Sequence, residues 1–122
     1  MAKSKNSSVQ IKNFVSPKNE SKSGEGILAS FSLPKGTWLL IGHTRVAGGS
    51  AGRRGLELTT GTIASASDSG NNTIYVGTSG NHAINCELLI TVSSSTTINL
   101  LYFTESNSTT FDYNVNGIKL SD

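Results

Sequence analysis

The sequence predicts an all-β domain: an antiparallel β-sandwich of seven to nine strands arranged in two sheets. Short segments with an apolar residue at every second position follow one another from residue 27 to residue 120, and this period is typical of strands with one buried face. Glycine, serine, threonine and asparagine are abundant between these segments, as they are in tight turns. No segment has the 3.6-residue period of an amphipathic helix.

The N-terminal part differs in composition from the remainder. Residues 1–25 are polar and contain five lysines. We expect them to form a linker or stem with one short strand near residues 9–15, where Val9 and Ile11 alternate with polar residues. Residues 26–122 are expected to form the sandwich domain, whose size suits a single core.

Two strands are expected at the start of this domain. The first is Ile27–Leu33, which ends where Pro34 and Gly36 favour a turn. The second and longest is Thr37–Val46. Its Trp38 lies on the face expected to be buried, in the core or at a subunit interface.

The middle of the domain is rich in glycine. An exposed loop over Ala47–Gly52 is expected to precede a strand over Arg54–Thr60 whose leucines point inward. We expect this strand to be followed by a long polar loop over Gly61–Asn72 and then by a short strand over Thr73–Val76.

The last third carries the clearest alternation. His82–Val92 has one continuous apolar face, and we expect Ser93–Ser95 to turn it into a hairpin with Thr96–Phe103. Thr104–Thr110 is expected to be a polar loop, and Phe111–Leu120 to supply the closing strand or strands.

Cysteine content and charge exclude several classes of protein. Cys86 is the only cysteine, so no disulfide forms within the chain, and its apolar neighbours indicate a small buried hydrophobe. The net charge of +2 is concentrated in residues 1–25, so the sandwich lacks the basic stripe that nucleic-acid binding needs. No apolar leader or membrane-spanning run is visible, so we expect neither a secretory signal nor membrane insertion.

The stretch Phe31–Gly42 has the pattern Phe-x-Leu-Pro-x-Gly-Thr-aromatic-Leu-apolar-x-Gly. It resembles the C-terminal head domains of bacteriophage tail fibres and baseplate receptor-binding proteins, which are similar to the jelly-roll heads of tumour necrosis factor and the complement-collagen proteins. The likeness extends to four later stretches: Arg53–Leu58, Thr96–Tyr102, Thr109–Tyr113 and Gly117–Leu120.

The resemblance implies a jelly roll that assembles as a homotrimer, with strands near both ends of the domain around the three-fold axis. It also implies a surface that binds a host cell-surface polysaccharide, contacts with other tail or baseplate proteins, and a place at the tail tip of a virion made in the host cytoplasm.

We expect the ligand to bind at four loops: residues 47–52, 65–72, 77–82 and 104–110. The side chains expected to reach it are Arg53, Arg54, His82, Tyr102 and Tyr113. An arginine beside a glycine-rich loop can hold a phosphate or carboxylate with two hydrogen bonds. The alternative is an exposed arginine pair that forms salt bridges with Glu57 or Glu87.

No catalytic or metal-binding pattern is visible. His43 and His82 lie far apart without a carboxylate at ligand spacing, so we expect no metal and no cofactor. His43 and Arg45, opposite the Trp38 face, are expected in solvent or at a subunit interface. Gly-x-Ser-x-Gly does not occur, and the acidic residues show no convergent pair. We therefore expect a binding protein and not an enzyme.

Three alternatives stay open from the sequence. The domain could be a structural trimerisation or capping domain of a fibre, with the host bound by another module. It could be a carbohydrate-binding module, for which a monomer is expected. A cytokine-like ligand for a protein receptor is disfavoured because a secretory signal is not visible and there is one cysteine.

Overall fold

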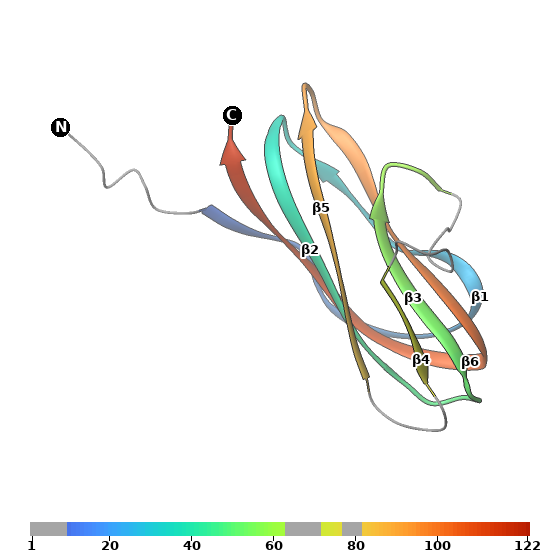
Figure 1. The fold of residues 1–122 in the computed structure, drawn as a ribbon. Helices are drawn as coiled ribbons and strands as arrows, with labels where there is room; N and C mark the ends of the chain where they lie inside the picture. Colours follow the sequence, from blue (N-terminus) through green and yellow to red (C-terminus); the bar gives the residue numbers. More distant parts are fainter. Residues whose placement is uncertain (1–9, 63–71, 77–81) are drawn as a thin grey trace.

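The computed structural model describes residues 10–62, 72–76 and 82–122, which contain six strands and no helix (Figure 1). All pairings among them are antiparallel. The strands are β1 (Gln10–Leu33), β2 (Gly36–Ala47), β3 (Gly52–Thr59), β4 (Asn72–Val76), β5 (His82–Val92) and β6 (Thr96–Ser121).

The two longest strands, β1 and β6, each take part in two sheets. Residues 99–104 of β6 pair with β3, and residues 96–104 pair with residues 24–33 of β1. Farther along β6, residues 110–121 pair with β2, and residues 109–119 pair with residues 10–22 of β1. One sheet therefore has the order β4-β3-β6-β1 and the other β5-β2-β6-β1. The jelly-roll sandwich that the sequence predicts is confirmed. Six elements fit the expected seven to nine strands because the expectation counted the halves of β1 and β6 separately.

The core lies between the two sheets. Leu40 of β2 and Leu100 of β6 are fully buried, and Leu58 of β3 is nearly so. The packing is tight at Gly42 of β2, where an added Cβ would lie 2.9 Å from Cys86 Sγ on the neighbouring strand β5 and 3.2 Å from Leu100 Cδ1 on β6. Gly42 is therefore required for this close packing, because a side chain there would overpack the core.

The alternation predicted for β2 and β5 is confirmed. Every second residue of β2 from Gly36 to Val46 is buried. Trp38 is buried among them, and its indole Nε1–H donates a hydrogen bond of 3.0 Å to the carbonyl oxygen of Pro34. Cys86 is buried in β5, where desolvation raises the pKa of its thiol to about 12. It is thus the inert hydrophobe that the sequence indicates.

The hairpin expected between β5 and β6 is wrong. β5 pairs with β2 along its whole length, and no ladder among the described residues joins β5 to β6. Residues 93–95 instead carry the chain from one sheet to the other. β5 buries alternate residues, whereas residues 98–102 of β6 are buried in succession. Both strands thus have an apolar face in the core, and alternation alone does not select the partner.

The polar loop expected over Thr104–Thr110 is part of β6. At this corner the two-residue step from Lys22 to Gly24 on β1 faces the five-residue step from Thr104 to Thr109 on β6, so the intervening residues bulge from the ladder. The hydroxyl oxygens of Thr104 and Thr109 lie 2.7 Å apart, in a buried hydrogen bond. The polar side chains of this stretch therefore supply hydrogen bonds at a buried corner of β6, and the stretch is not an irregular loop.

The described part of residues 1–25 also belongs to the sandwich. The strand expected near residues 9–15 continues without a break to Leu33, and β6 pairs with it from Gln10 to Leu33 apart from local register shifts.

Among the described residues, no helix is long and apolar enough to cross a membrane.

Candidate functional site

Arg54, one of the residues expected to reach a ligand, is buried, with 1% of its surface exposed. It shares the inward face of β3 with Leu56 and Leu58. Its guanidinium donates hydrogen bonds to three carbonyl oxygens of the preceding loop, those of Gly52 (2.7 Å), Ser50 (2.8 Å) and Gly48 (3.1 Å). Burial lowers the pKa of Arg54, and the charge of Glu105 opposes this only in part. Arg54 thus holds the glycine-rich loop in shape from inside.

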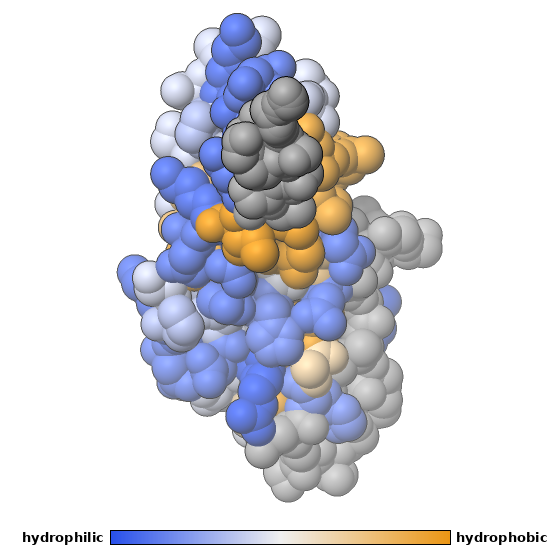
Figure 2. All heavy atoms as spheres, turned by 90° about the vertical axis from the view of Figure 1, so that its left-hand side faces the viewer, coloured by the Kyte–Doolittle hydropathy of each residue, from blue (hydrophilic) through white to orange (hydrophobic). Residues whose placement is uncertain are grey.

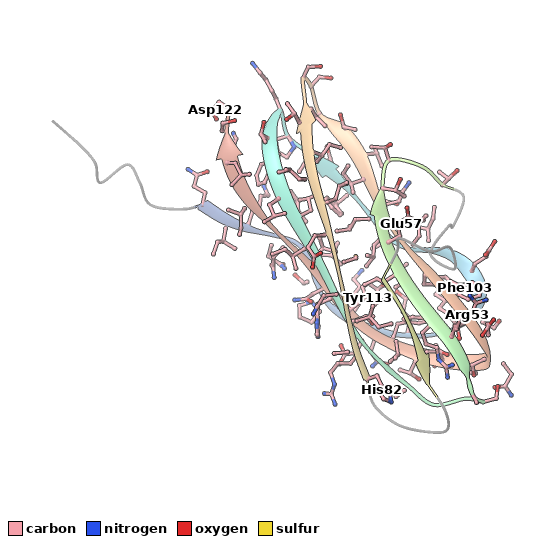
Figure 3. The ribbon with its side chains drawn as sticks, viewed as in Figure 1. Arg53, Glu57, His82, Phe103, Tyr113 and Asp122 are labelled. Atoms are coloured by element: carbon pink, nitrogen blue, oxygen red, sulfur yellow. The ribbon has the colours of Figure 1, made fainter. Side chains whose placement is uncertain are left out.

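Arg53, the next residue, points outward (Figure 3). It forms an ion pair with Glu105 of β6. Its backbone N–H donates to Glu105 Oε1 (2.7 Å), and its Nε and Nη2 donate to Oε2 (3.1 and 2.8 Å). The guanidinium carbon also lies 5.7 Å from the centre of the Phe103 ring. The hydrogen bonds between Arg53 and Glu105 lower the pKa of Glu105 and raise that of Arg53. The ion pair that the alternative interpretation expected therefore forms with a different carboxylate.

The hydroxyls of Tyr102 and Tyr113 form hydrogen bonds with β1 where this strand passes from one sheet to the other. The hydroxyl of Tyr102 donates to the carbonyl oxygen of Ser23 (2.9 Å), and that of Tyr113 lies within hydrogen-bond distance of the carbonyl oxygen of Leu28 (3.1 Å) and of the Glu20 carboxylate. Both rings are buried. Desolvation, followed by the contact with Glu20, raises the pKa of Tyr113. These hydroxyls are therefore occupied by hydrogen bonds within the fold.

His82 is exposed at the first position of β5. Most of the two loops over residues 65–72 and 77–82, in which the sequence also places ligand contacts, lies outside the described residues. His82 and Arg53 are thus the two expected site residues with exposed side chains, and their role in binding stays a prediction.

A hollow of about 170 Å³ lies at the outer face of the β5-β2-β6-β1 sheet. We call it the polar hollow. His43 of β2 lies directly opposite Asn114 of β6, and Arg45 lies opposite Asp112, so these four residues form a block across two strands. The lining residues are Pro17, His43, Arg45, Asp112, Tyr113 and Asn114.

One wall of the polar hollow is a bulge in β1. The pairing of β1 with β6 shifts register between Val15 and Lys18, which places Pro17 in the irregular stretch. The amide Nδ2 of Asn13 donates to the carbonyl oxygen of Val15 (3.1 Å) and to Asn116 Oδ1 (2.9 Å). Proline suits this place because it has no N–H to contribute to a ladder. The wall is therefore fixed by hydrogen bonds.

The charged groups of the polar hollow face solvent. Arg45 and Asp112 are exposed, and neither forms an ion pair with any residue in the described part of the chain. His43 is half-buried, and its Nδ1 lies 2.7 Å from Asn85 Oδ1 of β5, which fixes the ring. The sequence placed His43 and Arg45 on one face, but it missed the acid and the amide of β6. The missing signal was the register between the two strands.

A row of large apolar residues crosses the same face. Leu39 of β2 lies opposite Leu89 of β5 on one side and Ile118 of β6 on the other, and Ile118 lies opposite Ile11 of β1. Leu89 is 66% exposed and Ile11 is 69% exposed. Figure 2 shows a hydrophobic patch on this side of the molecule. We call these four residues the apolar row.

Comparison with known proteins identifies the fold but not a family. No family model matches the sequence, and no curated protein matches it. A structure of infectious bursal disease virus, Gx strain, aligns with a TM-score of 0.61 at 14% identity over 92% of this chain. This chain covers only 33% of that viral chain.

Two smaller proteins align along nearly their whole length. The Eiger TNF protein from S. frugiperda aligns with a TM-score of 0.57 at 8% identity, over 93% of this chain and 94% of its own. The CBM36-1 domain of a multidomain xylanase from the hindgut metagenome of Trinervitermes trinervoides aligns at 0.50 and 14% identity, over 94% and 99%. At these identities the similarity shows a shared jelly-roll fold alone.

Proposed function

We propose that this protein is a non-catalytic head domain of a viral particle, of the phage-tail type, which forms a homotrimer and binds a saccharide of the host cell surface. The resemblance in sequence to phage tail heads supports the viral role, and the jelly-roll fold is compatible with it. The observation that carries the proposal is that the apolar row and the polar hollow lie on the same face of one sheet.

The apolar row supports self-association. Exposed leucine and isoleucine side chains that adjoin one another on a surface indicate an interaction site. Two of the four, Ile11 and Ile118, lie on the strands near the two ends of the domain, where the sequence resemblance places the three-fold axis. Burial against a second and third copy would remove this apolar surface from water and stabilise the domain.

The assembly is tested by light scattering on a size-exclusion column. We expect a mass of three times 12.8 kDa for the protein. Leu89→Lys places a charge in the apolar row and is expected to shift the mass to that of a monomer. The matched control is Ile27→Lys, on the other sheet, where the side chain is 41% exposed and lies outside the row. A wild-type monomer would refute the trimer.

Binding is tested by a glycan array and by adsorption to host cells in parallel. The expected result is binding by the trimer, strengthened by the three equivalent sites. Intact trimers that bind no glycan would favour the structural capping domain, which the apolar row also supports. A monomer that binds polysaccharide would favour the carbohydrate-binding module.

A further inference from the structure

We infer that the polar hollow is the saccharide site and that it selects an acidic sugar, one with a carboxylate or phosphate next to free hydroxyls. The inference rests on the proposed function and specifies its ligand. Arg45 would bind the anionic group, and Asp112 and Asn114 would accept hydrogen bonds from the hydroxyls. Arg45, Asp112 and Asn114 are new assignments, because of the residues expected from the sequence to reach a ligand only Tyr113 lines the hollow.

Arg45 is the cation that lines the polar hollow. Arg53 is held by Glu105, and Lys22 and Lys119 lie within 3.2 Å and 2.8 Å of carboxylate oxygens. Arg45 has no such partner among the described residues, and its side chain is exposed. It sits on β2, which pairs on both sides, so its backbone is fixed before the ligand arrives. A guanidinium presented in this way can bind a carboxylate or phosphate with two parallel hydrogen bonds.

Asp112 and Asn114 give the hollow its hydroxyl-binding side. They are alternate residues of β6 on the face that Arg45 and His43 also occupy, because the strands are paired in register. A carboxylate accepts hydrogen bonds from hydroxyls, and an amide both accepts and donates. An anion alone would be repelled by Asp112. The ligand that satisfies both sides therefore carries hydroxyl donors as well as a negative charge.

The size and rigidity of the polar hollow suit one sugar ring. Its volume of about 170 Å³ is below the roughly 300–1,000 Å³ of pockets for larger ligands. The hydrogen bonds of Asn13 fix the Pro17 wall, and Asn85 holds the His43 ring. The hollow would therefore bind a single residue of a polysaccharide, with the rest of the chain outside.

The experiment compares acidic and neutral oligosaccharides on the intact protein. Isothermal titration would use three probes: a glucuronic acid oligosaccharide, a glycerol phosphate oligomer and a neutral glucose oligosaccharide. We expect the wild type to bind one of the two acidic probes more tightly than the neutral one, and the preferred probe identifies the anion as carboxylate or phosphate. Arg45→Gln should weaken that binding roughly 10- to 150-fold, as expected for lost hydrogen bonds between charged groups, with an unchanged melting temperature.

Two further variants separate recognition from folding. Glu87→Gln, on the same face of β5, is the control and should bind as the wild type does. In the double variant Arg45→Asp with Asp112→Arg the two charges exchange places. If the two residues only stabilise each other, this exchange would preserve binding. If they recognise the ligand, binding is lost while the trimer mass and melting temperature are kept.

The failures of the two proposals are distinguishable. A wild type that binds the acidic probes, with Arg45→Gln and the charge exchange equally active, overturns the polar hollow as the site and leaves the saccharide-binding function standing. A preference for the neutral probe overturns the acidic ligand. A wild type that binds no saccharide, in these titrations and on the array, overturns both.

Discussion

Replacement of Arg54 by alanine tests whether this buried arginine is structural. The change removes hydrogen bonds to the carbonyl oxygens of Gly48, Ser50 and Gly52. Each hydrogen bond to a charged group contributes about 1.5–3 kcal/mol, or roughly 4–9 kcal/mol for three. The folded protein also bears the cost of burying the guanidinium, which is several kcal/mol. The net loss in the free energy of unfolding should therefore be about 2–4 kcal/mol.

The assay is thermal unfolding followed by circular dichroism. For a domain of this length, 1 kcal/mol corresponds to roughly 4 °C, so Arg54→Ala should lower the melting temperature by about 8–16 °C. Arg53→Ala, at the next position, removes an exposed ion pair and should leave the melting temperature nearly unchanged. Equal melting temperatures for the two variants would refute the structural role. If Arg54→Ala then adsorbs less to host cells at a temperature where it is folded, Arg54 is a ligand contact, as the sequence predicted.

Two further substitutions test the packing and the corner. Gly42→Ala should lower the free energy of unfolding by about 1–3 kcal/mol in urea denaturation, because its Cβ would overpack the core. Adding Cys86→Ala to this variant should recover part of the loss, because the added Cβ would lie 2.9 Å from Cys86 Sγ. Strictly additive effects of the two substitutions on the free energy of unfolding would contradict this close contact. Glu20→Gln tests the contact with Tyr113, which together with Lys22 lowers the pKa of Glu20 in the fold. The stabilisation by a carboxylate with a lowered pKa is present above its unfolded pKa of about 4.3 and is lost as pH falls through the folded value. The wild type should therefore melt above Glu20→Gln at pH 7 and converge with it towards pH 3; a constant difference would exclude this linkage.

The alternation of apolar residues predicted the buried faces well. It identified the inward residues of β2 and β5, including Trp38 and Cys86, because burial on one face requires period two. Arg54, two positions before Leu56, shares this inward register, but it was expected to reach a ligand. The charge of Arg54 favours an exposed position, whereas its register in the strand favours a buried one. Fully buried arginines are rare, and in this case the carbonyl oxygens of the loop supply the hydrogen bonds that make burial possible.

The partners of the strands could not be predicted in the same way. The three-residue connection after Val92 suggested a hairpin, since sequential antiparallel strands often pair. Instead the chain crosses to the other sheet, and β5 joins β2. Alternation shows that a strand has an inner face, but not which strand lies next to it. The corner at residues 104–109 was missed for a related reason, because buried polar groups that bond to one another resemble a loop in sequence.

The surface features that matter most to the proposed function depend on those partners. Leu39 and Leu89 are 50 positions apart in the sequence, and each alone is an ordinary exposed or half-buried leucine. Only the β2-β5 register makes them neighbours, and only the β2-β6 register sets Arg45 opposite Asp112. The apolar row lies six residues along β2 from Arg45, about 20 Å at the rise of an extended strand. A neighbouring copy could thus cover the row and leave the polar hollow open to ligand, so assembly and binding should be separable. Leu89→Lys should abolish the trimer and retain the affinity of one site, whereas Arg45→Gln should do the reverse.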